Sequence, residues 1–360
     1  MDYIGLMAAG AIGVAGWTLY RRRRARAGQP RAAQTAPPTP EPRRAASPAS
    51  IIEATGGSAA LDLRRLTAVN QQMSERLWRL AYGAPAQSAP LEKPHAEVRV
   101  GVVARLQPET LNPDYFPRRP TLMQQLMRAV DDPDAAVDKL ARMITADPVI
   151  AADVLRIANS SLYRNASSPI ESVQRAIVVC GVSSLRGILA TAMVRPVFRA
   201  TRGNFPRLPR LLWERTERAT RAADLYAQSA SPQDRFEAQL AVLLNALGPL
   251  VVYSAALDAY AQRPRLTPNP GLLVELTMTL SAEMSRRIAQ EWSASARLIH
   301  ALKRAESEFL SGALALGELV GTAGVLEAHT LMSADERVTT AQAAGVDPTL
   351  IDTLGAPAAA

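Results

Sequence analysis

Cysteine is almost missing from this sequence, and its scarcity excludes one class of protein at once. Cys180 is the only cysteine among 360 residues. A single thiol cannot form an internal disulfide, so a small secreted fold held together by disulfide bonds is excluded. Cys180 lies within an apolar run, which favours a packing role over a reactive one.

Aromatic residues are also scarce. They make up 5% of the chain, whereas hydrophobic residues as a whole make up 48%. Alanine and leucine dominate that apolar fraction, and both favour helices over the strands of a β-sandwich. Enough apolar side chains are present for a large core, and we therefore predict an all-α, multi-helix bundle.

Most of the chain has no excess of positive charge, although its net charge is +8. Residues 1–50 contain eight arginines and only two acidic residues, so most of the excess belongs to this tail. The remainder is nearly neutral. Because binding to a nucleic acid backbone needs clustered positive charge, we expect no specific nucleic acid partner.

Charge is absent from residues 3–20. As a helix this stretch would be about 27 Å long, which is just enough to cross a hydrocarbon core. Arginines follow it directly, so the positive-inside rule predicts a single-pass inner (cytoplasmic) membrane anchor with the N-terminus outside and the later chain in the cytoplasm. The interfacial residues would be Trp17, Tyr20, Arg21, Arg22, Arg23 and Arg24.

Two alternatives apply to this segment. A cleaved signal peptide would carry its basic residues before the apolar stretch, and the order here is reversed. Gly5, Ala9 and Gly13 share one stripe of the helix, which would permit a homodimer through close helix approach. The simpler interpretation is that they are merely small residues in a minimal anchor.

Proline-rich stretches divide the rest of the chain. The helix expected at 61–82 either packs on the main domain or pairs with a partner, and packing is favoured. Val98, Val100 and Val102 alternate with other residues, which predicts a short strand or hairpin. The predicted segments are an anchor with a basic flank (1–26), a disordered linker (27–60), an amphipathic helix with a second linker (61–94), a helical domain (95–330) and a C-terminal extension (331–360).

Helix signals dominate after Pro120. Asp147-Pro148 and Ser168-Pro169 each place a capping residue before a proline, a pattern typical of helix starts. Further helices are expected over about 210–229, 234–261, 270–291, 295–309 and 311–327 from the helical spacing of their apolar residues.

Two blocks of this region resemble the signature of HDOD domains. They run from Asp147 to Ser160 (DPVIAADVLRIANS) and from Pro169 to Gly181 (PIESVQRAIVVCG). Their order and spacing also match, and a looser likeness covers roughly residues 110–310. The resemblance implies an all-helical relative of the HD metal-dependent phosphohydrolases, from a family generally taken as signalling and scaffolding modules.

The resemblance also indicates where a metal would be held, by His and Asp side chains that include a His-Asp pair. Asn245 and Ala246 stand where that pair would be, and Arg215 lies near the place of an earlier His. We therefore expect no catalysis and no metal or other cofactor. The alternative is a cryptic metal-dependent phosphohydrolase with an unusual ligand set. None of the three histidines is followed by Asp: His95, His300 and His329.

A polar cluster in the most family-like stretch is the candidate surface for protein partners. It comprises Asn159, Ser160, Tyr163 and Arg164, with Arg156 one turn earlier. The alternative for Asn159, which we favour, is a helix C-cap. Together these patterns predict a non-catalytic, membrane-tethered module that binds signalling proteins.

Overall fold

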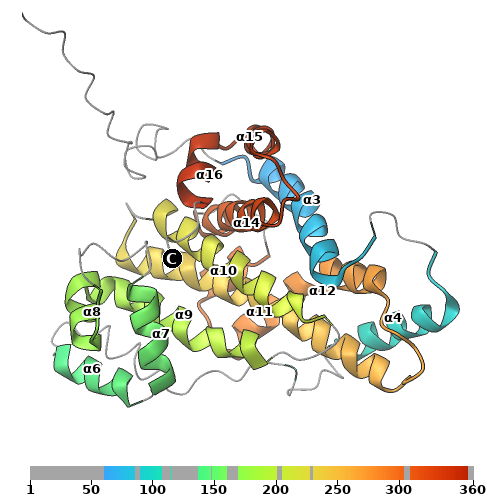
Figure 1. Cartoon of the computed structure of the whole chain (residues 1–360), viewed down its shortest axis with the longest axis horizontal. Helices are drawn as coiled ribbons and strands as arrows, with labels where there is room; N and C mark the ends of the chain where they lie inside the picture. The colour runs from blue at the N-terminus through green and yellow to red at the C-terminus, as the bar shows by residue number, and fades with distance from the viewer. Residues whose placement is uncertain are drawn as a thin grey trace, which may run out of the picture. The chain divides into compact units, whose positions relative to one another are not determined.

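The computed structural model describes residues 61–85, 90–107, 115, 137–146, 148–159, 169–200, 205–227, 230–303 and 309–355. All of them fall within one unit, Ala46–Ala360. The regular structure in these ranges is helical, which confirms the all-α prediction (Figure 1). The predicted anchor, its interfacial residues Trp17 and Tyr20 to Arg24, and the linker at 27–60 lie outside the described residues.

The helices keep close to the predicted segments. Their bounds are α3 Leu63–Tyr82, α4 Lys93–Arg105, α6 Val137–Thr145, α7 Pro148–Ala158, α8 Val173–Cys180, α9 Val182–Ala200, α10 Arg207–Tyr226, α11 Pro232–Ala261, α12 Pro270–Glu291, α13 Ala296–Ala301, α14 Phe309–Ala328, α15 Ala334–Ala343 and α16 Pro348–Gly355.

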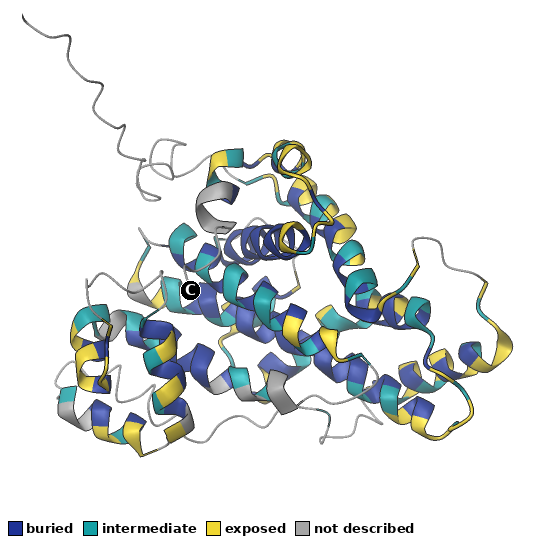
Figure 2. Ribbon diagram, in the orientation of Figure 1, coloured by how far each residue is buried: buried dark blue, intermediate teal, exposed yellow. Residues whose placement is uncertain are grey.

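The centre of the bundle is formed by α10, α11, α12 and α14. Helix α14 packs mainly on α10, and α11 packs mainly on α12. Figure 2 shows most of α14 buried, and every residue from Leu310 to Leu326 is buried. A helix that is apolar on all sides has to be enclosed by others, which is what happens here.

Two of these helices, α11 and α14, are long and apolar enough to cross a membrane by length and composition alone. Core helices meet the same criterion. The most apolar 18-residue stretch of α11 is 83% buried inside the protein, and that of α14 is 94% buried. Their apolar character is therefore accounted for by packing within the bundle.

Two glycines let α14 approach α10 closely. A Cβ atom added at Gly321 would lie 2.5 Å from the carbonyl oxygen of Arg215, and one at Gly317 would lie 2.8 Å from that of Ala219. Residues four apart lie on one face of a helix, so this face of α14 rests directly on the α10 backbone. Glu318, which follows Gly317, is thereby brought against α10.

Pro249 lies inside α11 and changes its hydrogen bonding. Proline has no N–H group, so the carbonyl of Asn245 loses its usual helical donor. The hydroxyl of Ser285 on α12 replaces it and donates to Asn245 O at 2.9 Å. The position of Asn245 is thus secured by a contact between α11 and α12.

Helix α3 packs on α12 and α14, as the favoured alternative predicted. Its buried face includes Leu66, Met73 and Leu77. Asn70 on the same face donates from Nδ2 to the carbonyl of Ala315 at 2.8 Å. The helix ends at Gly83, whose φ of 65° requires the left-handed conformation that glycine adopts easily.

The predicted strand at 98–103 is wrong, because these residues belong to α4. Val98 and Val102 are both fully buried, whereas Val100 between them is 65% exposed. An alternating run of three valines contains a pair four residues apart, and that pair forms one face of a helix just as well. Packing of α4 on α11 and α12 decides in favour of the helix.

Two helix boundaries also differ from prediction. Ser168-Pro169 does not start a helix: α8 begins at Val173, and its cap is Ser172, whose hydroxyl accepts from Arg175 N at 3.2 Å. The segment predicted as a helix over 295–309 contains the short α13, Ala296–Ala301. The C-terminal extension forms α15 and α16, which pack against α3, α10 and α14.

Candidate functional site

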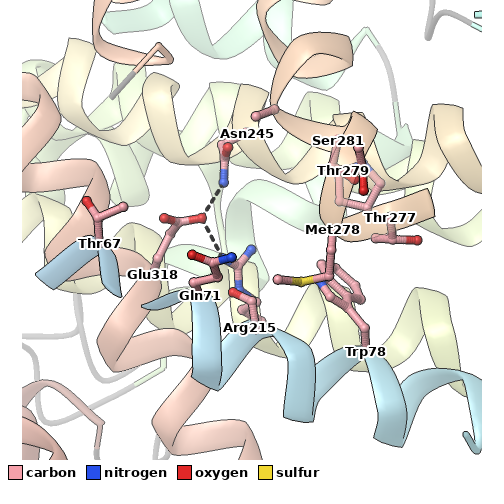
Figure 3. Close-up of a pocket in the computed structure, with 13 residues that line it drawn as sticks. Thr67, Gln71, Trp78, Arg215, Asn245, Thr277, Met278, Thr279, Ser281 and Glu318 are labelled. Atoms are coloured by element: carbon pink, nitrogen blue, oxygen red, sulfur yellow. Dashed lines mark hydrogen bonds and ion pairs between the residues drawn. The ribbon is translucent and has the colours of Figure 1, made fainter. Parts of the chain in front are cut away.

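A polar cavity of about 380 Å³ opens between α3 and α12. Its walls carry Thr67 and Trp78 from α3 and Thr279 from α12. Its floor comes from three other helices, with Arg215 on α10, Asn245 on α11 and Glu318 on α14 (Figure 3). The two walls and the floor thus draw on five helices.

The floor is a buried hydrogen-bond network. Arg215 donates from Nη2 to Oε1 of Glu318 at 2.8 Å and from Nε to the hydroxyl of Thr322 at 3.0 Å. Asn245 donates from Nδ2 to the same Glu318 oxygen at 2.8 Å. The side chains of Arg215 and Glu318 are each only 4% exposed. Opposite charges therefore compensate each other away from water, which is the condition for burying them.

Two of the three floor residues come from positions that the sequence indicated as lost metal ligands. Arg215 and Asn245 are 30 positions apart, yet both bind Glu318. The third residue was missed, because Glu318 lies beyond the stretch that resembles HDOD domains. A signal for it existed: α14 contains only two charged residues, Glu318 and Glu327, and an acid in such an apolar helix needs a buried partner.

These residues do not fit a metal ion. Among the described residues, no group of three or more His, Cys, Asp and Glu side chains could hold one. Arg215 brings a positive charge to the floor, and the amide of Asn245 is a donor to Glu318. A cation would need several oxygen or imidazole ligands together, and Ala246, where the Asp of the pair would stand, offers none.

The three histidines lie in different parts of the fold, and each has surroundings different from those of the cavity. His95 on α4 is buried, and its Nδ1 lies 3.0 Å from the hydroxyl of Tyr260. His329 follows α14, and its Nε2 lies 3.5 Å from Oε2 of Glu214. His300 is on α13. None of the three is among the residues that line the cavity.

Asn159 lies at the end of α7 and ties the chain to the segment before α8. Its Oδ1 accepts from Ile170 N at 2.7 Å, and its Nδ2 donates to Ile170 O at 2.8 Å and Leu155 O at 2.9 Å. These contacts are those of a helix-end residue that holds a turn together. Ser160, Tyr163 and Arg164 lie outside the described residues.

Arg156 belongs to an ion-pair cluster between α7 and α10. Its Nη1 lies 3.0 Å from Oε1 of Glu217, and its Nε lies 3.6 Å from Oδ1 of Asp153. Asp153 also binds Arg195 on α9. The Arg195 guanidinium in turn lies 5.6 Å from the ring centroid of Trp213, within the range of a cation–π contact.

Burial and hydrogen bonds shift the pKa values of three side chains, those of Tyr82, Cys180 and Glu214. It raises the pKa of the Tyr82 hydroxyl, which bonds to Thr277 at 2.9 Å behind the cavity wall. It raises the pKa of the half-buried Cys180 thiol, in keeping with the predicted packing role. Burial alone would raise the pKa of Glu214, but hydrogen bonds from Arg210 and His329 outweigh it and lower that pKa.

The sequence model of one family, the HDOD domain, matches residues 116–307. This range covers more than half of the chain, so the protein belongs to the HDOD domain family. A comparison with curated proteins found no match.

Three solved structures are similar to the chain. An HDOD domain protein of unknown function from Geobacter sulfurreducens has 20% identity and a TM-score of 0.49, with 71% of this chain and 93% of that one covered. A protein from Shewanella amazonensis, provisionally named a phosphohydrolase, has 22% identity and a TM-score of 0.48, again with 71% of this chain and 93% of that one covered. A provisionally named signal transduction protein from Marinobacter aquaeolei has 18% identity and a TM-score of 0.44, with 74% of this chain and 64% of that one covered.

The cavity reaches beyond the part of the chain that matches the family. Arg215 and Asn245 lie within residues 116–307, whereas α3 and α14 lie outside that range. The wall that carries Trp78 and the carboxylate of Glu318 are therefore additions to the matched region. The composition of this cavity is a property of the whole chain.

Proposed function

We propose that this HDOD domain protein is a non-catalytic signalling module that is tethered to the inner membrane and binds partner proteins. The observation that carries the proposal is the Arg215–Glu318–Asn245 network. Two of its members, Arg215 and Asn245, stand where the family resemblance would put metal ligands, and they supply a cation and a donor there.

The chemistry of phosphate hydrolysis supports this reading. Metal-dependent hydrolysis needs a cation that polarises the phosphate and lowers the pKa of a bound water. The buried guanidinium of Arg215 would repel such a cation, and Glu318, the one carboxylate on the floor, is already bound by two donors. Without metal chemistry, an HDOD domain can still act through binding.

The membrane tether rests on the uncharged residues 3–20 and the arginines after them. The described apolar helices α11 and α14 serve the core, so the N-terminal segment is the part of the chain that we assign to the bilayer. Fractionation tests this assignment. The full chain should stay with the membrane pellet after extraction at high pH, and a chain lacking residues 1–26 should become soluble. Release of the full chain by high salt alone would contradict it.

For the partner surface, we propose the α7–α8 end of the molecule, which carries Asn159 and the family signature. Val178 on α8 is 64% exposed there. We expect that Val178→Asp abolishes crosslinking to a membrane partner. Val100→Asp on α4 is the matched control, since Val100 is 65% exposed. Equal loss in both variants, or in neither, would contradict this surface.

Metal content and turnover test the absence of catalysis directly. The full chain, purified in detergent, is expected to hold no stoichiometric Mn²⁺, Fe²⁺ or Zn²⁺ and not to hydrolyse bis(p-nitrophenyl) phosphate above the rate of the heat-unfolded protein. Stoichiometric metal with turnover that Glu318→Gln removes would overturn the proposal in favour of a phosphohydrolase with an unusual ligand set.

A further inference from the structure

The cavity between α3 and α12 combines an open rim with a buried polar floor. At the rim, Gln71, Thr279 and Ala282 are exposed to solvent. At the floor, Arg215 and Glu318 are buried. A surface hollow whose polar groups become more buried with depth has the form of a ligand site.

Several polar groups face this space with hydrogen-bonding capacity left. Ser281 lines the cavity, and its buried hydroxyl has no hydrogen-bond partner among the described residues. The Arg215 guanidinium uses Nε and Nη2 in the floor network, and its Nη1 has no hydrogen bond within the described part of the chain. Thr67 and Ser74 add two hydroxyls from α3. A buried hydroxyl that lacks a partner is costly, and a ligand would satisfy it.

The charge of the floor selects against ions. Arg215 and Glu318 are the two charged residues that line the cavity, and they neutralise each other at 2.8 Å. A phosphate or carboxylate would gain from the guanidinium but would be repelled by Glu318. A cation would be attracted by Glu318 but repelled by the guanidinium. An uncharged ligand avoids both penalties and can accept from Nη1 of Arg215.

The lining also distinguishes among uncharged ligands. Most of its polar side chains are hydroxyls and amides, which both donate and accept, as the hydroxyl groups of a polyol do. Trp78 is the one aromatic ring in the lining, and Met278 is a further apolar residue of the lining (Figure 3). Trp78 is only 5% exposed, so it offers a small apolar contact, whereas a slot for a planar base would need two flat walls.

We propose that this cavity binds a small, uncharged polyhydroxylated ligand of monosaccharide or cyclitol size. The volume of about 380 Å³ is at the small end of the range for ligand pockets. Arg215 Nη1 and Ser281 Oγ bond to its hydroxyls, and Met278 with the accessible part of Trp78 offers apolar contact. Two of the helices that build the cavity, α3 and α14, lie outside the family-matched range. The inference goes beyond the proposed function, since it concerns binding of a small molecule and does not depend on tethering or partners.

The experiment uses the full chain in lipid nanodiscs without glycosidic detergent. Glucose, ribose and myo-inositol are titrated alongside their phosphate monoesters, with calorimetry and saturation-transfer NMR as readouts. We expect saturable binding of at least one uncharged probe and weaker binding of its phosphate. Ser281→Ala should weaken binding by about 2- to 10-fold, the value of one hydrogen bond, without loss of stability.

A pair of matched variants separates the cavity from the rest of the surface. Ala282→Trp places a large side chain at the rim and should abolish binding, whereas Ala343→Trp, at an exposed alanine on α15, should leave it unchanged. The proposal is overturned if none of the three uncharged probes binds, if a phosphate binds more tightly than its parent, or if Ala282→Trp binds like the unmodified protein. A failure of partner binding would leave these results unaffected, and if the chain does not insert into nanodiscs the same titrations are made with the full chain in solution.

Discussion

Arg215 and Glu318 are the two residues on which most of the site depends. Each is a charge that is 4% exposed, and each is compensated chiefly by the other. Taking two charges out of water is costly, and a buried pair is not in itself evidence of high stability. The pair does, however, make the removal of either partner expensive, because the remaining charge stays buried.

A double-mutant cycle measures this dependence. Arg215→Met and Glu318→Met should each lower the free energy of unfolding by about 3–5 kcal/mol, and the double variant should recover part of that loss. Urea unfolding followed by circular dichroism gives the values. Arg99→Ala is the control, since the Arg99–Glu275 pair is 46% and 50% exposed and its loss should cost less than about 1 kcal/mol. Additive losses in the double variant would show that the two residues are not coupled.

Cys180 offers a second test at the scale of one residue. Burial raises the pKa of its thiol, so at a given pH less of the reactive thiolate is present than in the unfolded chain. We expect iodoacetamide at pH 8 to alkylate the native protein several-fold more slowly than the urea-unfolded protein. The rate should rise with pH, with a midpoint above that of the unfolded thiol. A native rate equal to the unfolded one would contradict the packing role.

At the scale of helices, close contact between α10 and α14 positions the site. Gly317 and Gly321 remove the Cβ atoms that would hold the two backbones apart. The contact is what allows Glu318 to reach Arg215 from a helix that lies 103 positions later in the chain. On the other side of the floor, Pro249 leaves the carbonyl of Asn245 without its helical donor. The hydroxyl of Ser285 on α12 donates to that carbonyl and so holds Asn245 in place.

Alanine at one of these glycines should separate the helices. Gly321→Ala would place Cβ 2.5 Å from the Arg215 carbonyl, so we expect a loss of about 1–3 kcal/mol in the free energy of unfolding. Gly101→Ala in α4 meets only the flexible end of Arg105 and should be neutral or stabilising by up to about 1 kcal/mol. Thermal unfolding of the two variants distinguishes them, and equal effects would refute the close-contact argument.

At the scale of the whole molecule, the folded unit is larger than the family match. Leu66 and Met73 of α3 share a hydrophobic cluster with residues of α14, α15 and α16. Helix α14 covers α10 and is buried from Leu310 to Leu326. Residues 116–307 alone would therefore expose the faces of α10 and α12 that α14 and α3 cover.

Two fragments test this reasoning. We expect residues 61–355 to be soluble and to unfold in one cooperative transition. Residues 116–307 should aggregate or unfold without cooperativity, because large apolar faces are left uncovered. Analytical ultracentrifugation and calorimetry provide the measurements. A monomeric, cooperatively folded fragment 116–307 would show that α3 and α14 are dispensable additions.

Local patterns in the sequence by themselves indicated the helical class, and the two signature blocks indicated the HDOD family. The resemblance to that family led to the prediction that Arg215 and Asn245 stand where metal ligands would be. Spacing and composition are properties of neighbouring residues, so they can be read along the chain. Tertiary structure alone decided that α4 is a helix and that Glu318 completes the floor of the cavity. Those outcomes depend on contacts between distant segments, and a buried charge identifies its partner only when the helices that carry both are packed together.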